Sequence, residues 1–263
     1  MKASEMNDHF LSRATWVDRE RTGDKVLTGD PELDVDRCLV CWMADLAALR
    51  ESVRRGIRLV VCHEPVILEH GQDKPEGHPA RTDAKGRFAE DHGLVILRNH
   101  DAWDAWPGCG IPWAWAKFLG LEGEPAATGP NNWQHRYDIR PVAFGRFASA
   151  VAARTAAIAQ PVVELNGAPD KLVSKIGVGT GCYCDIFTYV DLGCDCCIVC
   201  DDGINYWRDI QYAEDRGIPV ICVNHATSEE PGMASMAKYI NEHFKGVRAE
   251  HLPQGCRFRL VGA

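Results

Sequence analysis

A three-part pattern recurs along this chain of 263 residues: a charged, helix-like stretch, a glycine, and an unbroken apolar run. The apolar runs end at Cys62, Leu97, Cys200 and Val223. Glycine commonly ends a helix, and a strand that is buried on both faces reads as a continuous apolar run. The pattern therefore predicts an α/β protein with mixed, largely parallel sheets.

Chemically active side chains follow these apolar runs. Three of the four runs are followed by a histidine, and carboxylates accompany every one. The residues are His63, Glu64, His100, Asp101, Asp104, Asp201, Asp202, His225 and Glu229. In open α/β sheets, ligands bind beyond the carboxyl ends of the strands. We therefore expect several of these side chains to share one site.

Histidine and carboxylate side chains that converge from different strands are the ligands of divalent-metal hydrolases. Two ions about 3.5–4 Å apart activate a water molecule between them. The spacing of His225 and Glu229 fits a strand end followed by the first turn of a helix, which Thr227 or Ser228 would cap. Mixed nitrogen and oxygen ligands favour Zn, Fe or Mn over Ca or a thiolate cluster.

Composition and charge exclude several classes of protein. A formal net charge of −8 argues against a nucleic-acid-binding surface. No apolar run approaches the roughly 20 residues of a membrane helix, and the first residues contain no apolar signal-peptide core. The sequence predicts a soluble cytoplasmic protein.

The twelve cysteines predict buried, reduced thiols. Cys197 and Cys200 have the spacing of a zinc or iron–sulfur pair, but they lie in an apolar run that predicts a strand. Residues three apart in a strand face opposite sides, so this pair would not hold one ion. The favoured interpretation is that these cysteines act as small, buried hydrophobic residues.

Two lobes are expected, at residues 1–122 and 123–263, because residues 122–136 read as a linker. A long polar stretch at 68–86, with His70 and His78, predicts a surface loop near the site. A closing strand is expected near residues 256–262.

The glycine-rich segment 177–181 follows a predicted strand. Its backbone N–H groups either cradle an anionic substrate, through Gly179 and Gly181, or form a plain tight turn. It lacks the lysine of a phosphate-binding loop.

The order of these motifs resembles the Nif-three-like family, the dinuclear-metal-centre proteins also labelled type-two GTP cyclohydrolase I. The matching segments are "WVD" (16–18), "CHEP" (62–65), "NHDAWD" (99–104), "FLGL" (118–121), "GVGTG" (177–181), "CDDG" (200–203) and "NHATSE" (224–229). The resemblance covers nearly the whole chain.

This resemblance implies two interlocked lobes that share a centre of one or two divalent ions. It implies His63, Asp104, His225 and Glu229 as ligands, His100 beside the metals, and a homo-oligomer, a hexamer in the family. Glu64 stands where the family has a second histidine, and it is expected to ligate and to shift preference toward harder ions. Asp202 lies near the position of the glutamate in the Thr-Gly-Glu motif of the family.

The expected function is metal-dependent hydrolysis of a nucleotide or phosphorylated small molecule, with His100 and Asp202 moving protons. The alternatives are a non-catalytic metal-binding or regulatory oligomer and a mononuclear deaminase-like hydrolase. The chain lacks the P-C-x-x-C signature of a deaminase-like hydrolase. Arg98, Lys175 and Arg208 are candidate substrate contacts by proximity in sequence alone.

Overall fold

The structure, a computed structural model, describes residues 1–64, 84–259 and 261. The polar stretch with His70 and His78 therefore lies almost wholly outside the described residues. Contacts divide the chain into two compact units. Unit 1 comprises residues 1–103 and 236–252, and unit 2 comprises 104–235 and 253–263. This division differs from the lobes expected on either side of residue 122.

Unit 1 contains a five-stranded sheet in the order β1-β4-β3-β2-β11. Its strands are β1 (Val26–Thr28), β2 (Arg37–Cys41), β3 (Leu59–Cys62), β4 (Val95–Arg98) and β11 (Arg248–His251). All neighbours are parallel except β1, which runs antiparallel to β4 at the edge. Cys62 pairs with Arg98. The residues that follow β3 and β4 therefore start from neighbouring points at one edge of the sheet.

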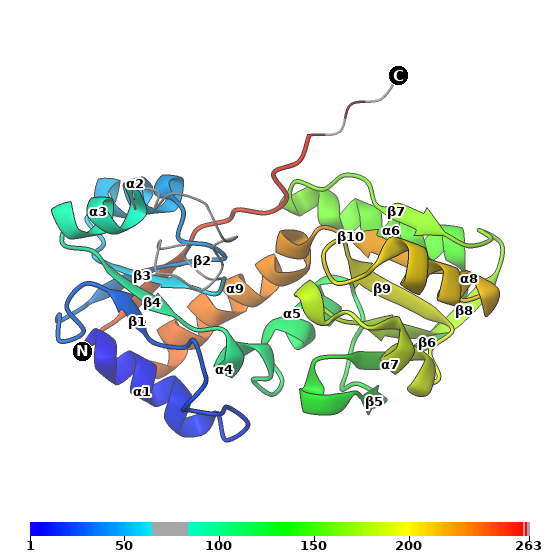
Figure 1. Cartoon of the computed structure of the whole chain (residues 1–263), viewed down its shortest axis with the longest axis horizontal. Coiled ribbons are helices and arrows are strands. Elements are labelled where there is room, and N and C mark those ends of the chain that lie inside the picture. Colours follow the sequence, from blue (N-terminus) through cyan, green and yellow to red (C-terminus); the bar gives the residue numbers. More distant parts are fainter. Residues whose placement is uncertain (65–83, 260, 262–263) are drawn as a thin grey trace, which may run out of the picture. The chain divides into compact units, whose positions relative to one another are not determined.

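Helices flank this sheet on both sides (Figure 1). They are α1 (Ala3–Arg13), α2 (Leu46–Arg54), α3 (Ala84–Asp91) and the short α4 (Asp101–Asp104). The start of α2 follows from its sequence, because the Asp45 carboxylate accepts a hydrogen bond from the Ala48 amide at 2.8 Å. Gly56, just beyond the helix, has a φ of +66°, which a glycine adopts without strain.

Unit 2 contains a six-stranded mixed sheet in the order β5-β6-β8-β9-β10-β7. Its strands are β5 (Ala127–Thr128), β6 (His135–Ala143), β7 (Glu164–Asn166), β8 (Leu172–Val178), β9 (Cys196–Cys200) and β10 (Val220–Val223). The three central strands β8, β9 and β10 are parallel, and the outer pairs are antiparallel. Both sheets are mixed, which confirms the predicted α/β class.

The helices of unit 2 supply much of its apolar core. They are α5 (Ile111–Phe118), α6 (Phe144–Thr155), α7 (Ile186–Asp191), α8 (Gln211–Asp215) and the first part of α9 (His225–His243). Single 3₁₀ turns occupy Pro130–Asn132, Ala156–Ile158 and Gly181–Tyr183, and Tyr206–Ile210 is a π-helical turn. Trp115, Phe144 and Tyr189 are the largest side chains buried against the strands.

Two sequence expectations differ from the structure. The expected linker at 122–136 includes β5, which pairs with β6 and so belongs to the sheet of unit 2. The closing strand expected near residues 256–262 is wrong for the part described there, because residues 252–259 form neither helix nor strand. Residues 252–259 pair with no strand in the described chain, so the alternation of polar and apolar residues there is not sufficient to form a strand.

The cysteine-rich run forms β9, as its lack of turn residues predicts. All five residues of Cys196–Cys200 are buried, and all twelve cysteines of the chain are free thiols. Burial raises the pKa of Cys197 well above its ordinary value. Among the described residues, no helix is both long enough and apolar enough to cross a membrane.

Candidate metal centre

His63 and Glu64 directly follow β3, and hydrogen bonds fix their backbone. The Trp42 carbonyl accepts hydrogen bonds from both of their amides, at 3.0 and 2.9 Å. The His63 ring is fully buried, and its Nδ1 lies 3.2 Å from the Asn99 carbonyl oxygen. Because a carbonyl only accepts, Nδ1 carries the proton and Nε2 is the nitrogen that can bind a metal.

His100 lies directly against His63 at the end of β4. Their rings stack with centroids 4.3 Å apart and an interplanar angle of 18°. The Asp101 Oδ1 atom lies 2.8 Å from His100 Nδ1, and the hydrogen bond from His100 holds the pKa of Asp101 well below its ordinary value. His100 Nε2 is 3.9 Å from Glu64 Oε1. The four side chains form one polar group at the edge of the unit 1 sheet.

Asp104 completes a set of candidate ligands. It is the last residue of α4, the helix that begins directly after His100, and only 5% of it is exposed. His63, His100 and Asp104 each offer one ligand atom, and these atoms lie within 4.8 Å of one another. Two imidazole nitrogens and a carboxylate are a donor set that suits Zn, Fe or Mn, so the residues present fit a divalent ion.

His225 and Glu229 form a second group, in unit 2. His225 is the first residue of α9, and Glu229 lies one turn further on. His225 Nε2 is 3.1 Å from Glu229 Oε2, as the four-residue spacing predicts. The expected cap is wrong: the Asp201 carboxylate, and neither Thr227 nor Ser228, accepts from the His225 amide at 3.0 Å.

Asp202 holds the other side of the His225 ring. Its Oδ2 atom lies 2.7 Å from His225 Nδ1. A histidine that binds a metal commonly donates its second ring N–H to a carboxylate, which orients the ring. Asp101 bears the same relation to His100. The carboxylate beside each histidine is thus placed to orient it.

Gly181 brings the loop after β8 close to this second group. Its φ is +54°, and a Cβ atom there would lie 2.5 Å from Glu229 Oε1 and 2.6 Å from His225 Nε2. Its amide donates to Ser228 Oγ at 3.3 Å, so that donor is already engaged. At Gly179 a Cβ would overlap the Tyr189 hydroxyl. Both glycines allow close packing, and neither shows a contact that marks an anion site.

Of the three cationic candidates, Arg98 lies at the first group, where its Nε donates to the His63 carbonyl at 3.1 Å. Arg208 is paired with Asp209 at 2.5 Å, and Lys175 lies on an exposed position of β8. Sequence reasoning named Asp101 only among the side chains that follow the apolar runs, and it considered Ser228 only as a helix cap. For Asp101 the available signal was its position directly after a candidate histidine.

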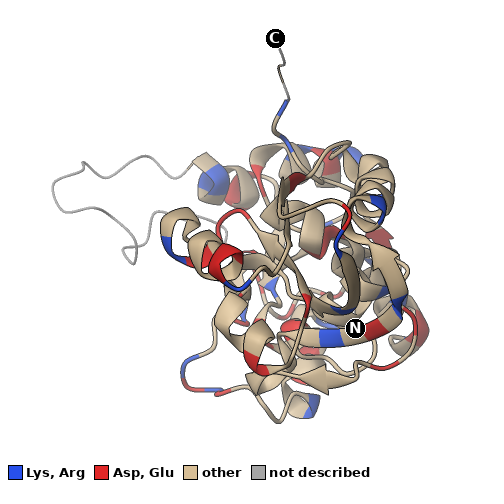
Figure 2. Ribbon diagram, turned by 90° about the vertical axis from the view of Figure 1, so that its right-hand side faces the viewer, with Lys and Arg blue, Asp and Glu red and all other residues tan. Residues whose placement is uncertain are grey.

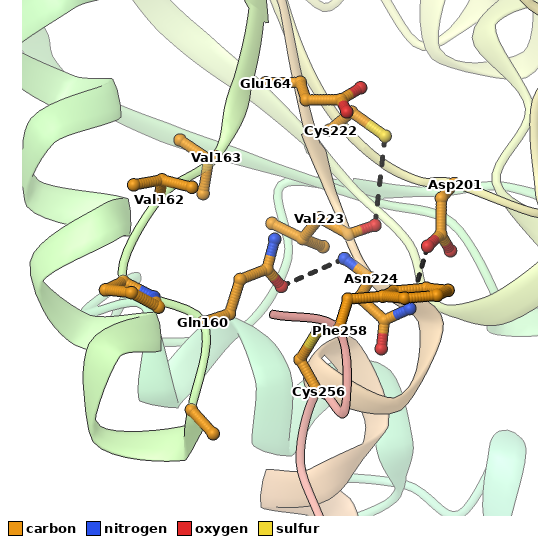
Figure 3. Close-up of a pocket in the computed structure, with 12 residues that line it drawn as sticks. Gln160, Val162, Val163, Glu164, Asp201, Cys222, Val223, Asn224, Cys256 and Phe258 are labelled. Atoms are coloured by element: carbon orange, nitrogen blue, oxygen red, sulfur yellow. Dashed lines mark hydrogen bonds between the residues drawn. The ribbon is translucent and has the colours of Figure 1, made fainter. Parts of the chain in front are cut away.

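A cavity of about 110 Å³ in unit 2 lies beside the residue that precedes His225 (Figure 3). The amide of Asn224 donates to Gln160 Oε1 at 3.0 Å, and its side chain donates to Asp201 at 2.8 Å. The lining residues are mainly apolar, with the carboxylates of Glu164 and Asp201 and no Lys or Arg. The cavity therefore does not suit a phosphate group, and it contains none of the candidate ligands.

The fold and these side chains define an α/β protein with clustered candidate ligands for a divalent ion. The model of the family Duf34/NIF3 (NGG1p interacting factor 3) matches residues 3–253, and the chain belongs to this family. No curated protein matches the sequence significantly.

Solved structures share the fold at low sequence identity. The hypothetical protein SA1388 of Staphylococcus aureus has a TM-score of 0.78 and 16% identity, with 99% of each chain covered. The Bacillus cereus protein related to NIF3 has a TM-score of 0.75 and 13% identity, covering 100% of this chain and 99% of that one. Reduced HcgD from Methanocaldococcus jannaschii has a TM-score of 0.72 and 16% identity, covering 96% and 98%.

Proposed function

We propose that this protein is a divalent-metal-dependent hydrolase that acts on a nucleotide or a phosphorylated small molecule. The observation that carries the proposal is the orientation of the histidines. His63 is oriented by a carbonyl, and His100 and His225 are each oriented by a carboxylate at 2.7–2.8 Å. In each case the contact is made through Nδ1, which leaves Nε2 on the side of the ring that can bind a metal.

The two groups together are proposed to bind one or two ions of Zn, Fe or Mn. His63, Glu64 and Asp104 would supply one part of the ligand set, and His225 and Glu229 the other. A bound divalent ion would act as a Lewis acid and lower the pKa of a water molecule that attacks the substrate.

His100 and Asp202 are the proposed proton-transfer residues. His100 is 14% exposed at its side chain, and Asp202 is 56% exposed, so both are reachable from solvent. His100 stacks on the His63 ring, and Asp202 is hydrogen-bonded to His225. His100 Nε2 has a second role open to it, since it belongs to the cluster of candidate ligand atoms.

A small-molecule substrate suits the charge of the protein better than a nucleic acid does. In Figure 2, Lys and Arg are interspersed with Asp and Glu along the described elements, and the net charge is −8. Arg98 lies at the first ligand group, where it donates to the His63 carbonyl, and it is the proposed contact for a phosphate. Gly179 and Gly181 are proposed to lie beside the substrate, with the Gly181 amide kept on Ser228. We further propose a cytoplasmic homo-oligomer.

One observation favours a second candidate, a non-catalytic metal-binding or regulatory protein. A hydrolase of phosphorylated compounds needs a cationic side chain at its substrate, whereas the candidates Arg98 and Arg208 are already engaged by the His63 carbonyl and by Asp209. A metal-binding protein without a reaction to catalyse has no such need.

Two measurements on the same preparations separate these functions. Protein loaded with Zn, Fe or Mn is assayed against a panel of nucleotides and phosphorylated metabolites. A hydrolase shows turnover that requires the metal and is lost in His225→Ala. Metal binding with no turnover on any member of the panel supports the non-catalytic function.

The role of Glu64 is tested by Glu64→His. Imidazole is a softer ligand than carboxylate, so this change should raise the affinity for Zn relative to Mn. Equal ratios of Zn to Mn affinity in the variant and the parent protein would show that Glu64 does not ligate.

A further inference from the structure

The turn that precedes β1 reaches the start of α4 through a buried carboxylate. Asp24 is 3% exposed. Its Oδ1 accepts from the amides of His100 and Asp101 at 2.7 and 3.1 Å, and its Oδ2 accepts from the Ala102 amide at 2.8 Å. A buried charge is costly, and three backbone hydrogen bonds offset part of that cost here. Asp24 thus fixes the backbone that carries His100.

Thr22 acts on the side chains of the same helix. Its hydroxyl donates to Asp101 Oδ2 at 2.7 Å and accepts from the Asp24 amide at 3.0 Å. A hydroxyl has one proton and two lone pairs, so both contacts can form together. The Asp101 carboxylate is therefore held from one side by Thr22 and meets His100 Nδ1 on the other, at 2.8 Å.

These contacts determine the proton position on His100. A carboxylate that is ionised at neutral pH has only acceptors, so His100 Nδ1 must carry the proton that joins it to Asp101. The unprotonated nitrogen is then Nε2, the form of the ring that binds a metal. A freely rotating Asp101 would not impose this tautomer.

We propose that Thr22 and Asp24 are positioning residues of the metal centre. Asp24 sets the place of His100 by holding the start of α4, and Thr22 sets its tautomer by orienting Asp101. Neither residue touches the metal. The inference rests on the proposed function, since it explains how one candidate ligand is prepared before any ion binds.

The first test needs no metal. In the ¹⁵N-labelled apo protein, a long-range ¹H–¹⁵N correlation reports which His100 nitrogen is protonated, and it is recorded on the alkaline plateau of a pH series. The wild type should show the Nδ1–H tautomer, and Thr22→Val should show a mixture of both. A wild type in the Nε2–H form, or a Thr22→Val protein with an unchanged tautomer, overturns the proposal.

The second test measures Co²⁺ affinity by competition with a chelator. Residues that orient a ligand typically change metal affinity by about 10–100-fold, so Asp24→Asn should weaken binding about tenfold and Thr22→Val several-fold. Asp45→Ala is the control, because Asp45 caps α2, which carries no candidate ligand, and alanine cannot accept the capping hydrogen bond. It should lose stability while it keeps Co²⁺ affinity.

The outcomes distinguish this proposal from the proposed function. If the wild type binds no divalent ion, the proposed function fails and the tautomer comparison alone decides the positioning role. If the wild type binds Co²⁺ and Thr22→Val binds it equally well, the positioning role is wrong and the metal centre stands. Should Asp24→Asn fail to fold, Thr22→Val carries the test.

Discussion

At the scale of single residues, the described histidines differ in what their ring nitrogens contact. His63, His100 and His225 are each oriented through Nδ1. His135 is held at both nitrogens: Nε2 lies 3.0 Å from the Asn132 carbonyl oxygen, and Nδ1 lies 3.3 Å from the Tyr137 hydroxyl. It has no nitrogen left for a metal, and it is a structural residue of β6.

His135 makes stability depend on pH. It is fully buried, and burial lowers its pKa from 6.5 to about 4. In the unfolded chain His135 binds a proton below about pH 6.5, whereas in the folded chain it does so only below about pH 4. The contribution of neutral His135 to the free energy of unfolding is therefore complete above pH 6.5 and falls as the pH drops through this window. Between pH 7.5 and 5, His135 should cost about 2 kcal/mol of unfolding free energy.

Urea unfolding at the two pH values, in wild type and His135→Gln, measures this cost. The variant starts less stable but should lose about 2 kcal/mol less than the wild type on acidification. His9, whose pKa is also lowered to about 4, remains in both proteins and cancels in the comparison. Equal losses in both proteins would contradict the assignment.

Gly181 gives a second prediction at this scale. Gly181→Ala would place a methyl group 2.5–2.6 Å from the outer atoms of Glu229 and His225, so these side chains must move. We expect metal affinity to fall by at least tenfold, measured by calorimetric titration, with about 1 kcal/mol lost from backbone strain.

Gly123→Ala is the matched control for Gly181→Ala. Gly123 also has a positive φ, of +84°, but a Cβ there would meet nothing within 4 Å. It should lose similar stability and keep full metal affinity. Equal affinities in the two variants would show that Gly181 only relieves strain.

At the scale of elements, α9 carries the second ligand group and packs closely on α5. A Cβ at Gly232 would lie 3.0 Å from Ile111 Cα and 3.3 Å from its Cγ1. Alanine in place of a helical glycine normally adds up to about 1 kcal/mol of stability, but crowding in a packed interface costs about 1–3 kcal/mol. We expect Gly232→Ala to lower the free energy of unfolding and to weaken metal binding through Glu229.

A double-mutant cycle with Ile111→Ala tests this packing by thermal and urea unfolding. Shortening Ile111 removes part of the crowding, so the double variant should be more stable than the sum of the single effects. Additive effects, or a Gly232→Ala protein that is more stable than the wild type, would show that α9 and α5 have room to adjust.

Much of the element structure could be predicted because it is encoded locally. The apolar runs that became β3, β4, β9 and β10 are buried on both faces, and Asp45 with Gly56 marks the two ends of α2. Elements that depend on a distant partner could not be predicted in this way. β11 is polar in sequence and forms because Arg37–Cys41 offers it an edge.

The candidate ligands were predictable from residue type and position, whereas the residues that orient them were not. Asp24 and Thr22 act on α4 from 76–79 positions away along the chain. No local pattern marks such a contact. The early aspartate that the sequence motif singled out, Asp18, is not the one that reaches the candidate centre in the described contacts.

At the scale of the whole molecule, we predict self-association. The family resemblance implies a homo-oligomer, so this protein should not be a monomer in solution. Multi-angle light scattering should give a mass that is a multiple of the 29.1 kDa chain at micromolar concentration. A mass of 29.1 kDa at that concentration would contradict this prediction and leave the metal centre to be explained within one chain.

The central claim is that the candidate ligands at the strand ends bind divalent ions. The most direct test is the metal content after dialysis against Zn²⁺ or Mn²⁺, measured by elemental analysis for wild type, Asp104→Asn and His225→Ala. His78→Ala serves as the control, since His78 lies in the polar stretch at 68–86, outside the motifs that carry the candidate ligands. The account predicts one or two ions per chain in the wild type and control, and loss of most of this metal in both other variants. Full metal content in His225→Ala would contradict it and would leave the histidines at the strand ends with a structural role alone.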